Sequence, residues 1–156
     1  MKRSIQIAVA AALVALSFPA GASELRVTVE GIRSAHGTVL IGLYDNPESF
    51  ERAVKASDRE GFLIDPDRFG AVALRANAAM RCTVIFGNLE PGRYAAIAFH
   101  DENGNGKLDK NFLGVPAEPY GFSKNVQGFL GPPTFGDAAI LLSDGDSAIS
   151  IVLTLP

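Results

Sequence analysis

Residues 101–109 form a short segment rich in acidic and amide side chains, with the sequence DENGNGKLD. Calcium takes six to eight oxygen ligands, and loops that wrap it supply ligands at positions 1, 3, 5, 7 and 9, with a glycine turn at position 6. Gly106 stands at position 6 of such a loop. The ligand positions hold Asp101, Asn103, Asn105, Lys107 (through its backbone carbonyl) and Asp109. The spacing therefore predicts a Ca²⁺ site.

The predicted calcium loop is incomplete. A bidentate Glu usually occupies position 12, and this chain has Phe112 there. Because only two ligand positions carry a formal charge, we expect weak binding, with a Kd on the order of 10⁻⁴ to 10⁻³ M. Glu118 is the best candidate for an additional carboxylate. Alternatively, Asn103-Gly104 or Asn105-Gly106 forms a tight hairpin turn, because Asn-Gly pairs tolerate positive φ, and no metal binds.

The chain has only two histidines as candidates for acid–base chemistry. His36 lies in a polar turn, and His100 lies at the end of an expected strand beside Asp101. A Ser-His-Asp arrangement can be written with Ser123, but adjacency in sequence does not orient a catalytic base. The chain has no nucleophile elbow, no His pair spaced for zinc and no phosphate-binding glycine motif. We therefore expect a non-catalytic protein, and a hydrolase that uses His100 is the less favoured alternative.

The N-terminus has the anatomy of a secretory signal peptide. Two basic residues precede the apolar run at residues 5–18, and residues 20–22 (Ala-Gly-Ala) match a cleavage site. We expect residues 1–22 to be removed at about Ala22/Ser23, which predicts a periplasmic or secreted protein. No later stretch approaches the roughly 20 apolar residues that a spanning helix needs, so we expect no membrane span.

The remaining residues, 23–156, are expected to form one acidic domain. Without Lys2 and Arg3, 12 basic residues face 17 acidic ones, which leaves a net charge of −5. Nucleic-acid binding is not expected, because Lys and Arg do not cluster. The single cysteine, Cys82, shares the strand parity of Val84 and Phe86, which predicts a buried thiol. We expect a monomer.

The dominant sequence period in this part of the chain is two, which is typical of half-buried strands. Apolar and polar residues alternate cleanly at residues 25–30 and 148–155. Further strands are expected at about residues 37–44, 70–76, 80–89, 93–100 and 138–142. Because no long helices alternate with these strands, the pattern predicts an all-β, antiparallel sandwich of about seven strands.

Two local signals interrupt the strands. Residues 47–55 predict one short helix, with Asn46 or Asp45 as N-cap and Pro47 at its first position. Further along the chain, Pro91-Gly92 predicts a tight turn. Tyr94 beside it is expected to hydrogen-bond back across a corner of the sandwich.

A long segment without helix or strand period covers residues 101–136. Loops longer than about 15 residues are uncommon unless they are functional or disordered, and the apolar composition here argues against disorder. We expect an ordered loop, pinned by the cation, that presents side chains to a small molecule, a glycan or a peptide. The candidate ligand-binding residues are His100, Glu118, Tyr120, Phe122, Lys124 and Asn125. Alternatively, the aromatic residues are buried and the domain is a purely structural or envelope-associated component.

Four sequence blocks resemble a known family, the bacterial exported domains grouped as domain of unknown function 2141 (DUF2141). The blocks are residues 89–95 (LEPGRYA), 99–109 (FHDENGNGKLD), 113–123 (LGVPAEPYGFS) and 131–135 (GPPTF). The resemblance extends over about residues 25–155 and implies an immunoglobulin-like or prealbumin-like β-sandwich. It also implies a loop similar to the calcium loops of bacterial surface-adhesin repeats, although those usually have an acidic residue where this chain has Phe112. It implies no activity.

Overall fold

The computed structural model describes residues 23–64, 70–74 and 80–156. Its strands are β1 (Ser23–Glu30), β2 (Thr38–Tyr44), β3 (Gly70–Leu74), β4 (Cys82–Leu89), β5 (Gly92–Asp101), β6 (Tyr120–Phe122), β7 (Ile140–Leu142) and β8 (Ser147–Val152). Its helices are α1 (Pro47–Lys55) and α2 (Phe135–Ala138), with 3₁₀ turns η1 (Phe62–Ile64) and η2 (Ser123–Asn125). The seven expected strands are all present, whereas β6 and α2 are additional. The expected signal peptide and residues 75–76 of one expected strand lie outside the described residues.

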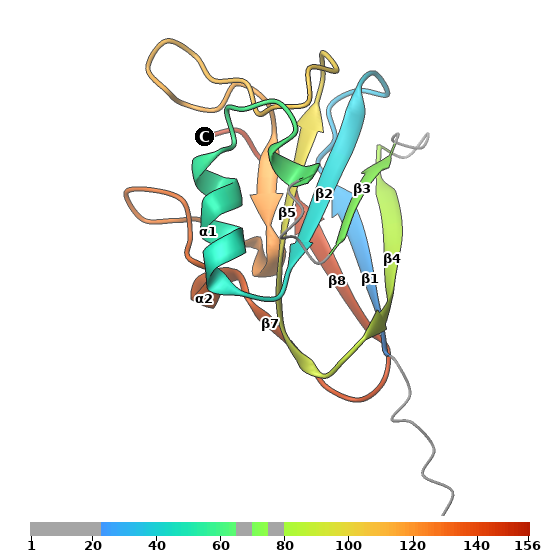
Figure 1. Cartoon of the computed structure of the whole chain (residues 1–156). Coiled ribbons are helices and arrows are strands. Elements are labelled where there is room, and N and C mark those ends of the chain that lie inside the picture. The colour runs from blue at the N-terminus through green and yellow to red at the C-terminus, as the bar shows by residue number, and fades with distance from the viewer. Residues whose placement is uncertain (1–22, 65–69, 75–79) are drawn as a thin grey trace, which may run out of the picture.

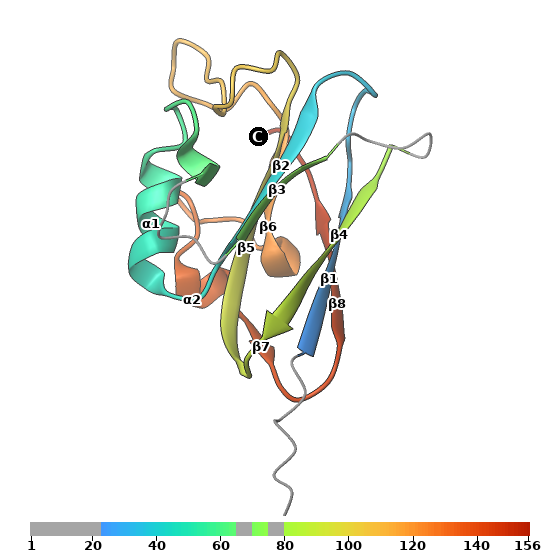
Figure 2. The same cartoon turned by 45° about the vertical axis from the view of Figure 1, so that its right-hand side comes forward.

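Two sheets face each other and confirm the expected β-sandwich (Figures 1 and 2). One sheet has the order β4-β1-β8, and the other has the order β3-β2-β5-β6, with β7 also paired to β5. The pairs β1-β4 and β2-β5 are antiparallel, as expected, but β1 and β8 run parallel. The first and last strands are not connected by a hairpin. The alternation of apolar and polar residues therefore predicts which side chains are buried, but not whether the two strands run parallel or antiparallel.

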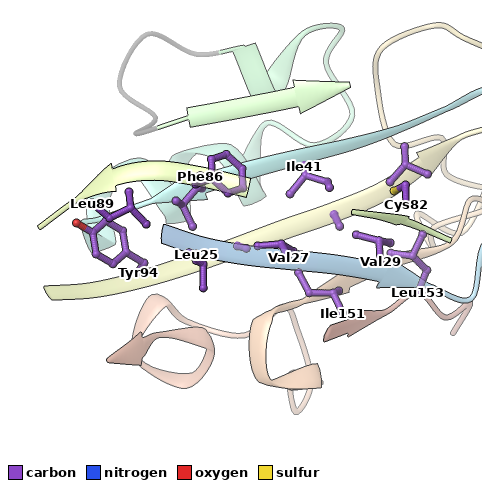
Figure 3. Packing of buried hydrophobic residues seen from close by; sticks show 14 of the residues in the cluster. Leu25, Val27, Val29, Ile41, Cys82, Phe86, Leu89, Tyr94, Ile151 and Leu153 are labelled. Atoms are coloured by element: carbon purple, nitrogen blue, oxygen red, sulfur yellow. The ribbon is translucent and has the colours of Figure 1, made fainter. Parts of the chain in front are cut away.

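The space between the sheets holds one apolar cluster, called here the sandwich core (Figure 3). Leu25, Val27 and Val29 of β1 point into it and are fully buried, whereas Glu24 and Arg26 point outward. Val39, Ile41 and Leu43 of β2 face them in the same cluster. Cys82 is buried there, as predicted, and its burial raises the pKa of the thiol to about 11. The thiol therefore stays protonated and unreactive at neutral pH.

The other face of the β2-β5-β6 sheet holds a second apolar cluster, called here the outer core. Figures 1 and 2 show α1 and α2 on this face, away from β1, β4 and β8. The Phe50 ring of α1 lies 5.9 Å from Tyr44, 6.1 Å from Phe122 and 5.9 Å from Phe135, measured between ring centroids. Because both faces of β5 are covered, residues 94–101 are buried without alternation.

The local signals around these cores are confirmed. Helix α1 begins at Pro47, and the Asn46 side chain accepts a 2.9 Å hydrogen bond from the backbone N–H of Ser49. The Tyr94 hydroxyl donates to the carbonyl oxygen of Glu90 at 2.9 Å. Both interactions are local in sequence, so the residue types alone predicted them.

The long segment after β5 is ordered but contains short elements that the sequence pattern did not predict. β6 pairs with β5 over three residues, and backbone N–H···O bonds of 3.1 and 2.9 Å join Tyr120 to Thr154 across the edge of the sandwich. Helix α2 has four residues and a capping box formed by Thr134 and Asp137. Elements of three or four residues are too short to show a period. Among the described residues, no helix is long and apolar enough to cross a membrane.

Candidate functional site

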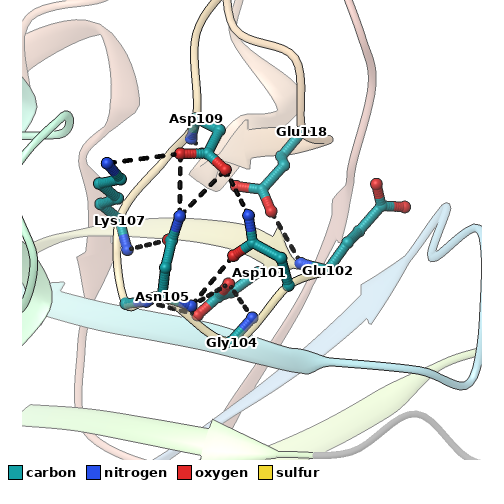
Figure 4. A network of polar contacts seen from close by, with 9 residues as sticks. Asp101, Glu102, Gly104, Asn105, Lys107, Asp109 and Glu118 are labelled. Atoms are coloured by element: carbon teal, nitrogen blue, oxygen red, sulfur yellow. Dashed lines mark hydrogen bonds and ion pairs between the residues drawn. The ribbon is translucent and has the colours of Figure 1, made fainter.

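The loop at residues 101–109 is organised by the side chain of Asp101 (Figure 4). One carboxylate oxygen accepts from the backbone N–H groups of Gly104 and Asn105 at 2.7 and 3.1 Å, and the other accepts from Gly106 at 2.8 Å. Gly104 and Gly106 have φ values of 76° and 74°, a conformation that favours glycine. The N-terminal half of the predicted calcium loop is therefore wound around the carboxylate at position 1.

Asp109 closes the other end of the loop. It accepts a 2.6 Å hydrogen bond from the Asn103 amide nitrogen and 3.0 Å bonds from the Asn105 amide nitrogen. The Lys107 ammonium nitrogen lies 3.8 Å from the same carboxylate. The structure thus brings the side chains of the predicted ligand residues into one network, but it surrounds Asp109 with hydrogen-bond donors.

The amide orientations decide how well this loop fits a cation. The side-chain oxygens of Asn103 and Asn105 accept from the backbone N–H groups of Asn105 and Lys107, at 3.0 and 3.1 Å. Turning these oxygens toward a cation beside Asp109 would break both bonds. In the part of the chain that the structure describes, no group of three or more His, Cys, Asp or Glu side chains is placed to hold a metal.

Glu118 fastens the loop rather than lining a cavity. Its two carboxylate oxygens accept from the backbone N–H groups of Glu102 and Asp109, at 2.8 and 3.0 Å, and the residue is only 4% exposed. Burial raises the pKa of this carboxyl above its ordinary value, the negative charges of Asp109 and Asp101 raise it further, and the two N–H donors oppose the shift. The position predicted as an additional carboxylate therefore joins the two ends of the loop.

The residues of the alternative Ser-His-Asp arrangement are bonded to other groups. His100 is buried, and its Nε2 donates to the carbonyl oxygen of His36 at 2.7 Å. The Ser123 hydroxyl accepts from the N–H of Ala96 at 2.9 Å and donates to the carbonyl oxygen of Ala138 at 2.6 Å. These contacts join backbone segments, as structural side-chain hydrogen bonds commonly do.

A cavity of about 790 Å³ opens beside the outer core. Its walls come from β5, β6, α1 and η1, from two loops of the long segment (residues 110–116 and 126–133), and from the last residues of the chain. The apolar lining residues are Val54, Phe62, Ile97, Phe99, Leu108, Val115, Pro116, Tyr120, Phe122, Val126, Pro132, Pro133, Val152, Leu155 and Pro156. This composition is typical of sites for small apolar ligands.

Three of the predicted ligand-binding residues line this cavity, namely Tyr120, Phe122 and Asn125. His100, Glu118 and Lys124 are not among its lining residues. Asn125 is already committed to the fold, because its amide donates to the carbonyl oxygen of Ser150 at 3.2 Å and accepts from the N–H of Val152 at 2.7 Å. The sequence did not identify the contributions of α1, η1 and the C-terminal residues, since no local motif links them.

The polar part of the cavity wall is small. The lining side chains that carry nitrogen or oxygen are Ser57, Lys110, Tyr120, Asn125, Gln127 and Thr154. Among the described lining residues there is no acidic side chain, and Lys110 is the basic one. The wall therefore fits a molecule with an apolar body, and Lys110 offers a partner for an anionic group.

Comparison with known proteins identifies the family of the chain. A family model described as an uncharacterised protein conserved in bacteria, DUF2141, matches residues 27–150. The match covers most of the chain, so the chain belongs to this family, as its sequence blocks predicted. No curated protein and no solved structure matched the chain.

Proposed function

We propose that this member of the DUF2141 family is an exported, non-catalytic module that binds a small apolar or amphipathic molecule in the cavity beside the outer core. The observation that carries the proposal is the cavity itself, whose volume of about 790 Å³ lies in the range of ligand sites. The predicted secretory leader supports a periplasmic or secreted location.

The packing of the molecule supports a binding role for this space. Here two aromatic pairs belong to the cavity wall: the ring centroids of Phe62 and Phe99 lie 5.1 Å apart, and those of Tyr120 and Phe122 lie 5.9 Å apart. Rings that are packed against each other keep their orientation, so a ligand would meet a wall that is already formed.

The lining residues also indicate the chemical class of the ligand. An apolar body would cover the aromatic and aliphatic wall, while an anionic or hydrogen-bonding head group would lie near Lys110 and Gln127. A single-chain amphiphile with a carboxylate or phosphate head meets both requirements. A highly hydroxylated glycan would leave most of its polar groups without partners on this wall.

The weak Ca²⁺ site stays part of the proposal as a device that stabilises the loop. What supports it is the converging set of carboxylate and amide groups at Asp101, Asn103, Asn105 and Asp109. Binding would replace two amide-to-backbone hydrogen bonds by metal contacts, which agrees with the low affinity expected from the sequence.

Binding of a neutral naphthylamine fluorophore tests the cavity. The Val115→Trp variant places a large ring in the cavity wall, and Ile85→Trp on β4 is the matched control, because Val115 and Ile85 are 37% and 45% exposed. We expect saturable binding by the chain from Ser23 onward, an affinity lower by about tenfold or more in Val115→Trp, and no change in Ile85→Trp.

Two results would contradict the proposal. One is the absence of saturable binding by the unmodified chain, and the other is equal affinity in the Val115→Trp variant with its fold intact by circular dichroism. Mass spectrometry of an organic extract of the protein, purified from its own cells, would then identify the natural ligand by its mass.

A further inference from the structure

Two pairs of large apolar side chains are exposed beside the cavity. Phe112 and Leu113 are 95% and 72% exposed, and Phe129 and Leu130 are 93% and 94% exposed. They belong to residues 110–116 and 126–133, two loops that also contribute cavity walls. Figure 1 shows both loops projecting on the side of α1, in the golden and orange part of the colour range. Paired exposure of this degree next to a ligand cavity indicates an interaction surface.

The first loop presents its apolar pair on an ordered backbone. Lys110 and Pro116 form a β-bridge, and the N–H of Asn111 donates to the carbonyl oxygen of Val115 at 2.8 Å. The Asn111 side chain also accepts from the N–H groups of Leu113 and Val115, at 2.9 and 3.1 Å. The loop therefore satisfies several of its own backbone groups, which lowers the cost of moving it out of water.

The second loop is also a tight turn. A Cβ atom at Gly128 would overlap the carbonyl oxygen of Gly131. The backbone segments at the two sides of this turn therefore approach so closely that only glycine fits at position 128. Leu130 has a φ of 59°, in the left-handed region. A bulky residue rarely adopts this conformation. The exposure of Leu130 therefore follows from the backbone geometry of the turn and not from the conformational preference of leucine.

The charges around the loops differ from those of the rest of the chain. The whole chain has 17 acidic residues, but residues 110–136 contain only Glu118, which is buried. The same segment contains Lys110 and Lys124, both exposed. The two loops themselves therefore contain no carboxylate, and Lys110 and Lys124 lie at or near their bases. Asp109 next to Lys110 and the exposed Asp137 near Lys124 lie outside the loops.

We propose that Phe112-Leu113 and Phe129-Leu130 insert into the interfacial region of an anionic phospholipid bilayer. A protein partner would need a continuous surface of about 800 Å² on each side, with a packed core. Two separate loop tips offer apolar points rather than such a surface. Interfacial amphipathic helices bury their apolar side chains about 5–10 Å deep at the boundary of the acyl chains, and the loop tips offer side chains of the same kind. The inference goes beyond ligand binding, and it places the cavity mouth against the lipid.

Introduced tryptophans test the proposal, since the chain has no Trp of its own. Phe112→Trp and Phe129→Trp are compared with Leu141→Trp on β7, where Leu141 is 78% exposed outside both loops. With vesicles of phosphatidylglycerol and phosphatidylcholine, we expect the emission of the first two variants to shift to shorter wavelength and that of the control to stay unchanged. The shift should be weaker with phosphatidylcholine alone and at high salt.

A second variant removes the apolar tips. Replacing Phe112, Leu113, Phe129 and Leu130 together by Ser should lower partitioning into the anionic vesicles by about tenfold or more. Binding of the naphthylamine probe should be unchanged in this variant, so the two proposals fail separately. Unchanged vesicle partitioning, no tryptophan shift at either loop, or an equal shift at Leu141→Trp would overturn the inference. A shift that grows with protein concentration without vesicles would also overturn it and would indicate a second copy as the occupant.

Discussion

The two faces of the β2-β5-β6 sheet border apolar regions of different character. The sandwich core is built from alternating residues of long strands and is closed, and Leu25, Val27, Val39 and Ile41 have no exposed surface. The outer core is assembled from short elements far apart in sequence, and it leaves a cavity of about 790 Å³. From this difference we infer that the sandwich core provides most of the stability, whereas the outer core provides the proposed binding site.

Matched leucine truncations test this comparison with the largest effect. Leu25→Ala should lower the free energy of unfolding by about 2–5 kcal/mol, because it leaves a hole in a closed core. Leu108→Ala should cost less, because Leu108 already lines an open cavity that the loop or solvent can fill. Leu141→Ala, at an exposed position, should change stability by less than about 0.5 kcal/mol. Urea unfolding measures all three, and an equal or larger loss for Leu108→Ala would contradict the comparison.

Calcium should affect only the side of the molecule that contains the cavity. At a free Ca²⁺ concentration of ten times Kd, linkage predicts about 1.4 kcal/mol of added stability. The loop contacts the α1 side through Leu108 N–H to the carbonyl oxygen of Ser57 at 2.8 Å and Gly61 N–H to that of Gly106 at 2.9 Å. Hydrogen exchange should therefore slow around these contacts, and the gain should be absent in Asp109→Asn. If Ca²⁺ and chelator give the same melting temperature, the predicted calcium site is wrong.

The smallest effect concerns the pH dependence of stability through Glu118. Because burial raises its pKa in the folded state above 4.5, the folded protein binds the proton more tightly than the unfolded chain does. The contribution of this group is therefore most favourable at low pH, and stability falls as the pH rises from 4.5 through the folded pKa. Urea unfolding across this window should show the fall, and Glu118→Gln should remove it. An NMR titration of the Glu118 carboxyl with a midpoint at or below 4.5 would contradict the assignment.

Several features were predictable from the sequence because their causes are local. The cap and first residue of α1, the Tyr94 hydrogen bond and the inward parity of Leu25 and Cys82 depend on residues near one another in the chain. The immunoglobulin-like or prealbumin-like topology of the sandwich stays a prediction, which the family resemblance implies.

The candidate site was predictable only in part. Tyr120, Phe122 and Asn125 were candidates because they lie in a long, apolar loop, and they line the cavity. Phe62 and Leu155 were not candidates, since a residue joins a cavity wall through the fold and not through its sequence neighbours. His100 and Glu118 are residue types that often take part in catalysis or binding. Here both side chains are buried and hydrogen-bonded to the backbone, so they support the fold.

The sequence by itself determined the alternation that buries the sandwich core, the capped helix and the polar loop at residues 101–109, since each follows from side-chain type and spacing over a few residues. Only the tertiary structure decided that β1 and β8 run parallel, that the amides of Asn103 and Asn105 turn toward Asp109, and that a cavity remains beside the outer core. These features depend on contacts between segments that are far apart in the sequence. Hydrophobic burial is non-directional, so a local pattern of apolar residues does not determine which distant segments meet or how they are oriented.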